Sequence, residues 1–77
     1  MIYFVYTNFR QRADGAIGHT CTHFTNIEDA RMEYHAQLAS QYTPASRESN
    51  LWATVQLQEQ TGYVIAGETA TFGEAAE

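Results

Sequence analysis

The sequence contains no lysine, and its four arginines face nine carboxylates, which gives a formal net charge of −5. A chain with this charge repels phosphate backbones, so direct binding to nucleic acid is not expected. Cys21 is the single cysteine, which excludes an internal disulfide and suits a reducing compartment. The sequence also lacks an apolar run long enough to span a bilayer and a basic segment leading into an apolar one. Neither a membrane span nor a signal peptide is therefore predicted.

The length of 77 residues corresponds to one domain. A domain of this size buries only about 60% of the surface that its unfolded chain exposes, which leaves little core for a catalytic cleft. We expect a single domain over residues 1–70, followed by an acidic C-terminal tail over residues 71–77, "TFGEAAE".

Two strands joined by a tight turn are predicted at the start of the chain. Residues 2–10, "IYFVYTNFR", are aromatic and β-branched on both alternating faces, as in a strand that is buried on two sides. "ADGA" at 13–16 contains Asp-Gly, a strong signal for a hairpin turn, and residues 17–24 return as the second strand.

A helix is predicted over residues 26–42. Thr25 is a good N-cap, and Glu28 three residues later completes a capping box. Apolar residues follow helical spacing and give the helix one stripe that faces a core. Pro44 ends the helix, and residues 43–50 are expected to form a polar loop. The stripe consists of Ile27, Ala30, Tyr34 and Leu38, with Tyr42 at its flank.

The rest of the chain predicts a second hairpin. Residues 51–59, "LWATVQLQE", alternate between apolar and polar as in a half-buried strand. "QTG" at 60–62 is a turn, and residues 63–70 form a fourth strand. The predicted fold is therefore α+β with the order ββαββ, a four-stranded antiparallel sheet with one helix packed on one face.

The stretch "HTCTH" at 19–23 places His19, Cys21 and His23 on one face of the second strand. Neighbouring members of this row lie about 6–7 Å apart, so all three reach one ion only if the strand bends. His35 would add a fourth ligand only if this face meets the helix, and no CxxC or HxxxH spacing is present. We expect a polar strand at a sheet edge and no bound metal.

No catalytic set is recognisable. Cys21 with a nearby histidine is the minimum for a thiol nucleophile, but no feature indicates an activated thiolate or an oxyanion hole. Glu28, Asp29 and Glu33 are expected to form the solvated face and the start of the helix. The chain is therefore not expected to be an enzyme, and no cofactor is predicted.

Aromatic residues make up 13% of the chain. One helix covers only one side of a sheet, so some of the first strand and the Trp52 side of the third must lie on the opposite side. Exposed aromatic patches mark interaction surfaces, although such rings also fill thin cores. We predict a protein partner or a homodimer, bound through Tyr3, Arg10, Arg12 and Trp52.

Two segments, "YFVYTNFRQRADG" at 3–15 and "EYHAQLAS" at 33–40, resemble a group of small proteins encoded by phages and prophages of Gram-positive bacteria. The group has no settled activity, so the resemblance implies no site residues. It implies a mobile genetic element and a product that acts by binding. We expect this product in the cytoplasm of the host cell.

Two functional hypotheses remain. The first is an inhibitor that occludes a host defence complex, as anti-CRISPR proteins do when they cover nucleic-acid channels. The second is a virion or assembly component that packs through its sheet face or its edge strands. Acid clustered on one face would favour the first, and a repeating edge contact the second.

Overall fold

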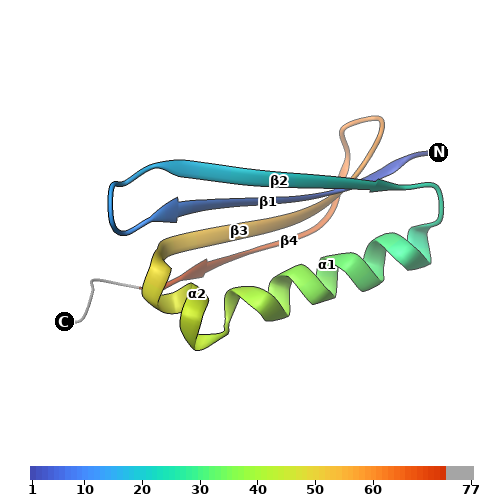
Figure 1. Ribbon diagram of the computed structural model, residues 1–77. Helices are drawn as coiled ribbons and strands as arrows, with labels where there is room; N and C mark the ends of the chain where they lie inside the picture. Colours follow the sequence, from blue (N-terminus) through green and yellow to red (C-terminus); the bar gives the residue numbers. More distant parts are fainter. Residues whose placement is uncertain (73–77) are drawn as a thin grey trace.

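Over residues 1–72, which the computed structural model describes, the chain forms a four-stranded sheet and two helices (Figure 1). Every neighbouring strand pair is antiparallel, in the order β2-β1-β3-β4. The predicted α+β fold with the strand and main-helix order ββαββ is confirmed. The elements are β1 (Tyr3–Gln11), β2 (Ile17–Phe24), α1 (Ile27–Gln41), α2 (Pro44–Ser49), β3 (Asn50–Glu59) and β4 (Val64–Thr71).

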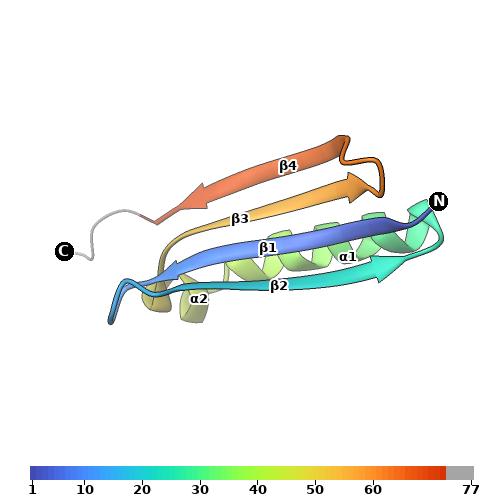
Figure 2. The ribbon, with the colours of Figure 1, turned by 90° about the horizontal axis from the view of Figure 1, so that it is seen from above.

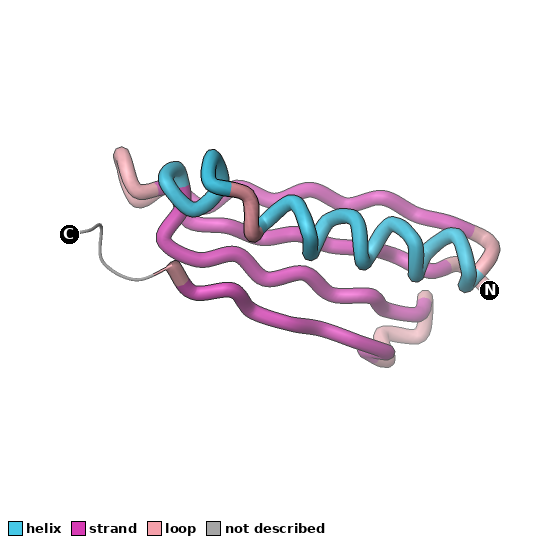
Figure 3. Tube along the Cα trace, turned by 90° about the horizontal axis from the view of Figure 1, so that it is seen from below, coloured by secondary structure: helices cyan, strands magenta, loops and turns pink. Residues whose placement is uncertain are grey.

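The helices lie on one side of the sheet. In Figure 2 the strands lie in front of both helices, and in Figure 3 α1 runs across the face that is turned toward the viewer. The other side, which we call the open face, has no helix over it in the described part of the chain. Strand register and side-chain alternation place the following residues on the open face: Phe4, Tyr6, Asn8 and Arg10 of β1; Ile17, His19, Cys21 and His23 of β2; Trp52, Thr54, Gln56 and Gln58 of β3; and Val64, Gly67, Thr69 and Thr71 of β4.

The core lies between the sheet and α1. Val5, Val55 and Leu57 are the largest fully buried side chains, and Ala30 and Tyr34 of α1 pack against them. Ile27 and Leu38 are partly buried against the same cluster. The predicted stripe of α1 is therefore confirmed.

The predicted N-cap was wrong by one residue. Asn26, and not Thr25, is the N-cap of α1, and its Oδ1 accepts a hydrogen bond from the Glu28 backbone N–H at 2.7 Å. Asparagine is at least as good a cap as threonine, so local composition did not distinguish the two residues.

The segment predicted as a loop contains a second, short helix, α2. Thr43 is its N-cap, with Oγ1 accepting from the Ser46 backbone N–H at 3.3 Å, and Pro44 lies in its first turn. Proline is favoured there because its missing N–H and fixed φ suit the first helical position. Pro44 therefore begins α2 as well as following the end of α1, a second role that the predicted loop lacks.

The second hairpin continues beyond its predicted end. Thr71 belongs to β4, and the Phe72 backbone N–H donates to the Leu51 carbonyl at 2.9 Å. The first two residues of the predicted tail are thus paired with β3, and the remainder of that tail, residues 73–77, lies outside the described residues.

Candidate protein-binding surface

The open face carries three aromatic side chains on its two central strands: an adjacent pair on β1, and Trp52 on β3 two open-face rows farther along. Phe4 and Tyr6 of β1 stack with ring centroids 6.0 Å apart and an interplanar angle of 27°. Trp52 of β3 lies in the row formed with Arg10 of β1 and Thr71 of β4. The three rings are half-buried although no described helix lies over them. We call Phe4, Tyr6 and Trp52 the aromatic layer.

Charge is distributed unevenly between the two sides of the molecule. Among residues 1–72, Arg10 is the one permanently charged side chain that strand alternation places on the open face. The carboxylates of the described residues lie at the first turn, on the helices, or on strand positions that face the helix side. The negative charge therefore surrounds the helix layer and leaves the aromatic layer free of acid. These carboxylates are Asp14, Glu28, Asp29, Glu33, Glu48, Glu59 and Glu68.

Two exposed aliphatic residues extend the aromatic layer toward the sheet edges. Ile17 of β2 is 58% exposed and lies opposite Arg10, and Val64 of β4 is 43% exposed and lies opposite Gln58. Sequence reasoning did not single out Ile17 or Val64. The alternation of β2 could have predicted Ile17, because it places Ile17 on the same face as His19.

The structure brings together only two of the four residues predicted to bind a partner, Arg10 and Trp52, which are cross-strand neighbours. Tyr3 lies on the helix side, where it packs against the core cluster. Arg12 lies beyond β1, and its Nε and Nη2 donate to the Arg47 carbonyl of α2 at 3.2 and 3.0 Å. Tyr3 and Arg12 are thus placed away from the open face, and a partner-binding role for any of the four stays a prediction.

The histidine row lies where the sequence placed it, on an edge strand. His19, Cys21 and His23 are exposed on the open face of β2. His35 lies on α1, on the opposite side of the sheet, where its ring contacts the Tyr34 ring edge-on at 5.3 Å. It therefore cannot complete a ligand set with the row, and residues 1–72 contain no group of three or more metal-ligating side chains suited to a metal ion.

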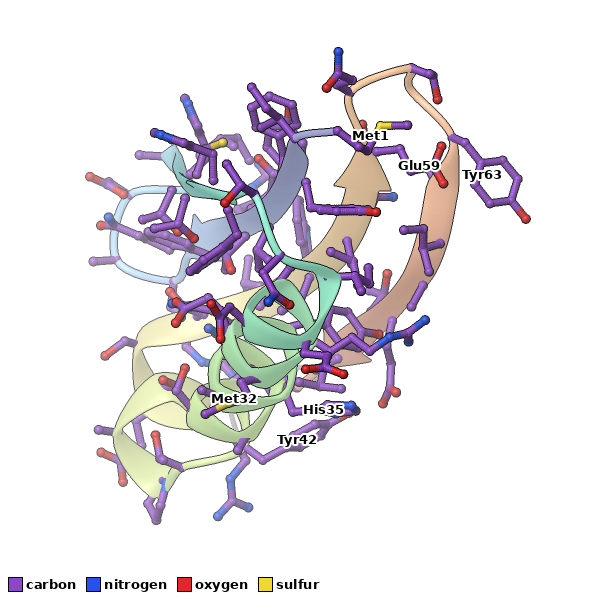
Figure 4. The ribbon with its side chains drawn as sticks, turned by 90° about the vertical axis from the view of Figure 1, so that its right-hand side faces the viewer. Met1, Met32, His35, Tyr42, Glu59 and Tyr63 are labelled. Carbon is purple, nitrogen blue, oxygen red and sulfur yellow. The ribbon has the colours of Figure 1, made fainter. Side chains whose placement is uncertain are left out.

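A polar contact links the end of α1 to β4. The Tyr42 hydroxyl donates a hydrogen bond to Oε2 of Glu68 at 2.8 Å, and this bond raises the pKa of Tyr42 above its ordinary value of 10.0. Burial, and secondarily the Glu68 charge, raises the pKa of Tyr34. Figure 4 shows Tyr42 and His35 on the same side of α1 and Met32 on the other. Both shifts move the tyrosine pKa farther above neutral pH, so these hydroxyls are protonated near pH 7.

A cleft of about 650 Å³ lies between the first hairpin turn and α2. The Phe9 ring, Arg12 and the buried Asn50 contribute to its walls. Arg12 donates to backbone carbonyls there, including that of Phe72 at 3.4 Å, so its guanidinium joins the turn to neighbouring segments. Glu48 and Ser49 at the end of α2 also line the cleft.

Over residues 1–72 the chain is a two-layer α+β protein whose helices lie on one side of the sheet. Comparison of the chain with protein-family models, curated proteins and solved structures gave no match. In residues 1–72 neither helix is both long and apolar enough to cross a membrane.

Proposed function

We propose that this chain is a small acidic protein-binding module that contacts its partner through the open face. The observation that carries the proposal is the aromatic layer, which has no described helix over it and has Arg10 beside Trp52. Tryptophan, tyrosine and arginine dominate binding hot spots, and charged side chains are depleted at the centres of interfaces. The open face has this composition.

The open face also indicates the chemistry of the partner. Its rings require an apolar surface opposite them, and Arg10 is placed to pair with a carboxylate at the margin of that surface. The carboxylates of the described residues lie away from this face, so we do not expect them to select the partner.

Within this class, we propose a phage- or prophage-encoded inhibitor that occludes a host nucleic-acid-binding defence complex in the host cytoplasm. The clustering of acid supports it. When the open face is docked, the helix layer with Glu28, Asp29 and Glu48 is directed away from the partner. It then presents negative charge to any nucleic acid that approaches the covered surface, and like charge opposes that approach.

A virion or assembly component is the second candidate function. The observation that favours it is that β2 and β4 are both sheet edges, available for pairing in the described part of the chain. A component of this kind would assemble with its own copies or with other phage proteins, without affecting host defence.

Phage plating on a Gram-positive host with an active CRISPR defence tests the inhibitor proposal. We expect the expressed wild-type chain to restore plating and Trp52→Ala to lose this effect. Tyr63→Ala is the matched control, because Tyr63 is 66% exposed and points outward from the β3–β4 turn, away from the open face (Figure 4). Plating that the wild-type chain leaves unchanged contradicts the inhibitor, and equal loss in both variants contradicts the role of the open face.

A further inference from the structure

Strand β2 is an edge strand without the features that normally prevent edge-to-edge pairing. It pairs with β1 in one uninterrupted register, from Tyr3 opposite Phe24 to Arg10 opposite Ile17. It contains no proline, lysine, arginine or carboxylate, and six of its eight residues are exposed. The other edge, β4, has an irregularity opposite Leu57 and Gln58 and carries Glu68. Natural edge strands are commonly protected by charge, proline or bulges, so β2 is the edge suited to accept another strand.

The hydrogen bonds of the first hairpin determine which backbone groups of β2 face outward. The Gln11 N–H donates to the Ala16 carbonyl at 2.9 Å, so these opposed residues lie at a hydrogen-bonding position of the ladder, although the Ala16 N–H itself donates to Oδ1 of Asp14 in the turn. Such positions alternate along an antiparallel ladder. The backbone groups of Gly18, Thr20, Thr22 and Phe24 therefore point toward β1. Those of the alternate residues point away from the sheet: Ile17, His19, Cys21 and His23.

We propose that β2 pairs antiparallel with β2 of a second copy of this chain, about a two-fold axis at Cys21. In this register Cys21 lies opposite Cys21 of the second copy, and His19 lies opposite His23. Each of these residues presents outward N–H and C=O groups, so opposed residues form hydrogen-bonded pairs. Both helix layers then lie on the same side, and the open faces of the two copies join into one surface.

The charge of the chain opposes association of two copies less at this edge than at segments that carry carboxylates. Two chains of net charge −5 repel each other, and association is least opposed where neither presents a carboxylate. β2 is such a segment. Because the paired surface is the same on both copies, the contact closes on itself and stops at a dimer.

A groove between α1 and β2 provides apolar surface beside the proposed seam. It has a volume of about 300 Å³, and Met32, which is 72% exposed, lies in its wall on the side of α1 away from Tyr42 (Figure 4). Met32 and Ala36 lie about 8 and 14 Å along the helix from its first residue, and Cys21 lies about 10 Å along β2 from Phe24. Along the strand direction, Met32 therefore lies slightly before the two-fold axis and Ala36 slightly after it. The grooves of the two copies meet at this level. Its full lining is Phe24, Asp29, Met32, Glu33 and Ala36.

Sedimentation of the purified chain under reducing conditions tests the dimer, at concentrations from about 1 µM to about 1 mM, which spans moderate to weak affinities. Cys21→Lys places two lysines opposite each other at the seam, and like charges so placed are destabilising. We expect the Kd to rise about tenfold or more. Thr69→Lys is the matched control, because it adds the same charge to the exposed open face of β4. Added salt should tighten the dimer, since Asp29 and Glu33 line the grooves beside the seam.

Oxidation tests the register independently. Opposed residues of a hydrogen-bonded pair have Cα atoms about 5.5 Å apart, within the range that a disulfide spans. The wild-type chain should therefore cross-link through Cys21. In a Cys21→Ser background, chains with His19→Cys should cross-link to chains with His23→Cys, and neither should cross-link to itself.

Three results would overturn the proposal. They are a monomer at every concentration, a dimer that Thr69→Lys disrupts while Cys21→Lys does not, and cross-linking that does not follow this pairing. Because these experiments need only the purified chain, their outcome is separate from that of the proposed function, which depends on Trp52 and an external partner. Thermal unfolding of each variant verifies that the fold is retained.

Discussion

Replacing Gly18 by alanine probes the pairing of β1 with β2 directly. Gly18 lies opposite Phe9, and a Cβ at Gly18 would lie 2.5 Å from Cζ and 2.7 Å from Cε2 of the Phe9 ring. Carbon atoms pack best at about 3.5–4.0 Å, so the ring must move by about 1 Å. Overpacking of this kind costs about 1–3 kcal/mol. Removing a glycine from the unfolded chain offsets about 0.4–1 kcal/mol of this cost.

We therefore expect Gly18→Ala to lower the free energy of unfolding by about 1–2 kcal/mol in urea titrations, with the denaturant slope unchanged. Gly67→Ala is the matched control, since it also replaces a strand glycine. Its added Cβ would lie 3.3 Å from Cγ of Gln56, a flexible side chain that can move aside. We expect its stability to stay within about 0.5 kcal/mol of wild type or to rise slightly. Equal stability changes in the two variants would refute the placement of Phe9 over Gly18.

Other predictions concern the core, the helix cap and the contact between α1 and β4. Leu57→Ala removes a fully buried side chain and should cost about 2–5 kcal/mol of unfolding free energy in urea titrations. Asn26→Ala should lower the free energy of unfolding, measured by thermal melting, by about 1 kcal/mol, while Thr25→Ala should have little effect. A larger loss in Thr25→Ala than in Asn26→Ala would show that Thr25 is the cap. The raised Tyr42 pKa means that the folded chain holds this proton more tightly than the unfolded chain, so its stabilising contribution is complete below the ordinary pKa of 10.0 and is lost as pH rises through the raised value. The free energy of unfolding of the wild type, measured from about pH 9 to about pH 11, should show this loss. Tyr42→Phe has no hydroxyl to donate to Glu68, so its free energy of unfolding should fall less over the same pH range.

The main elements of the fold follow from local signals in the sequence. Asp14 and Gly15 predicted the first turn, and Gly15 there has a φ of 72°, which glycine adopts at little cost. The alternation of β3 correctly separated the buried Val55 and Leu57 from Trp52. The stripe of α1 was equally clear. Each of these signals is contained within a few neighbouring residues, so none depended on knowing how distant segments pair.

The candidate binding surface was harder to predict, because it depends on which face of β1 joins Trp52. Both faces of β1 are apolar, so alternation left the choice between Tyr3 and its neighbours Phe4 and Tyr6 open. The antiparallel register with β3 decides it by pairing Arg10 with Trp52, which places Tyr3 against the core. Likewise, α2 is too short to show helical periodicity, and its cap and proline were interpreted as features of a loop.

The proposed function requires that the aromatic layer of the open face is a binding surface and not core. The most direct test measures unfolding free energy and partner capture for the same three proteins: wild type, Trp52→Ala and the control Tyr63→Ala. Capture is quantified from a lysate of a Gram-positive host. Because Trp52 is only half-buried, we expect its removal to cost about 1 kcal/mol of stability, below the 3–5 kcal/mol typical of a core tryptophan, and to abolish capture that Tyr63→Ala retains. A loss of about 3 kcal/mol or more in Trp52→Ala, with capture equal to that of wild type, would contradict the claim.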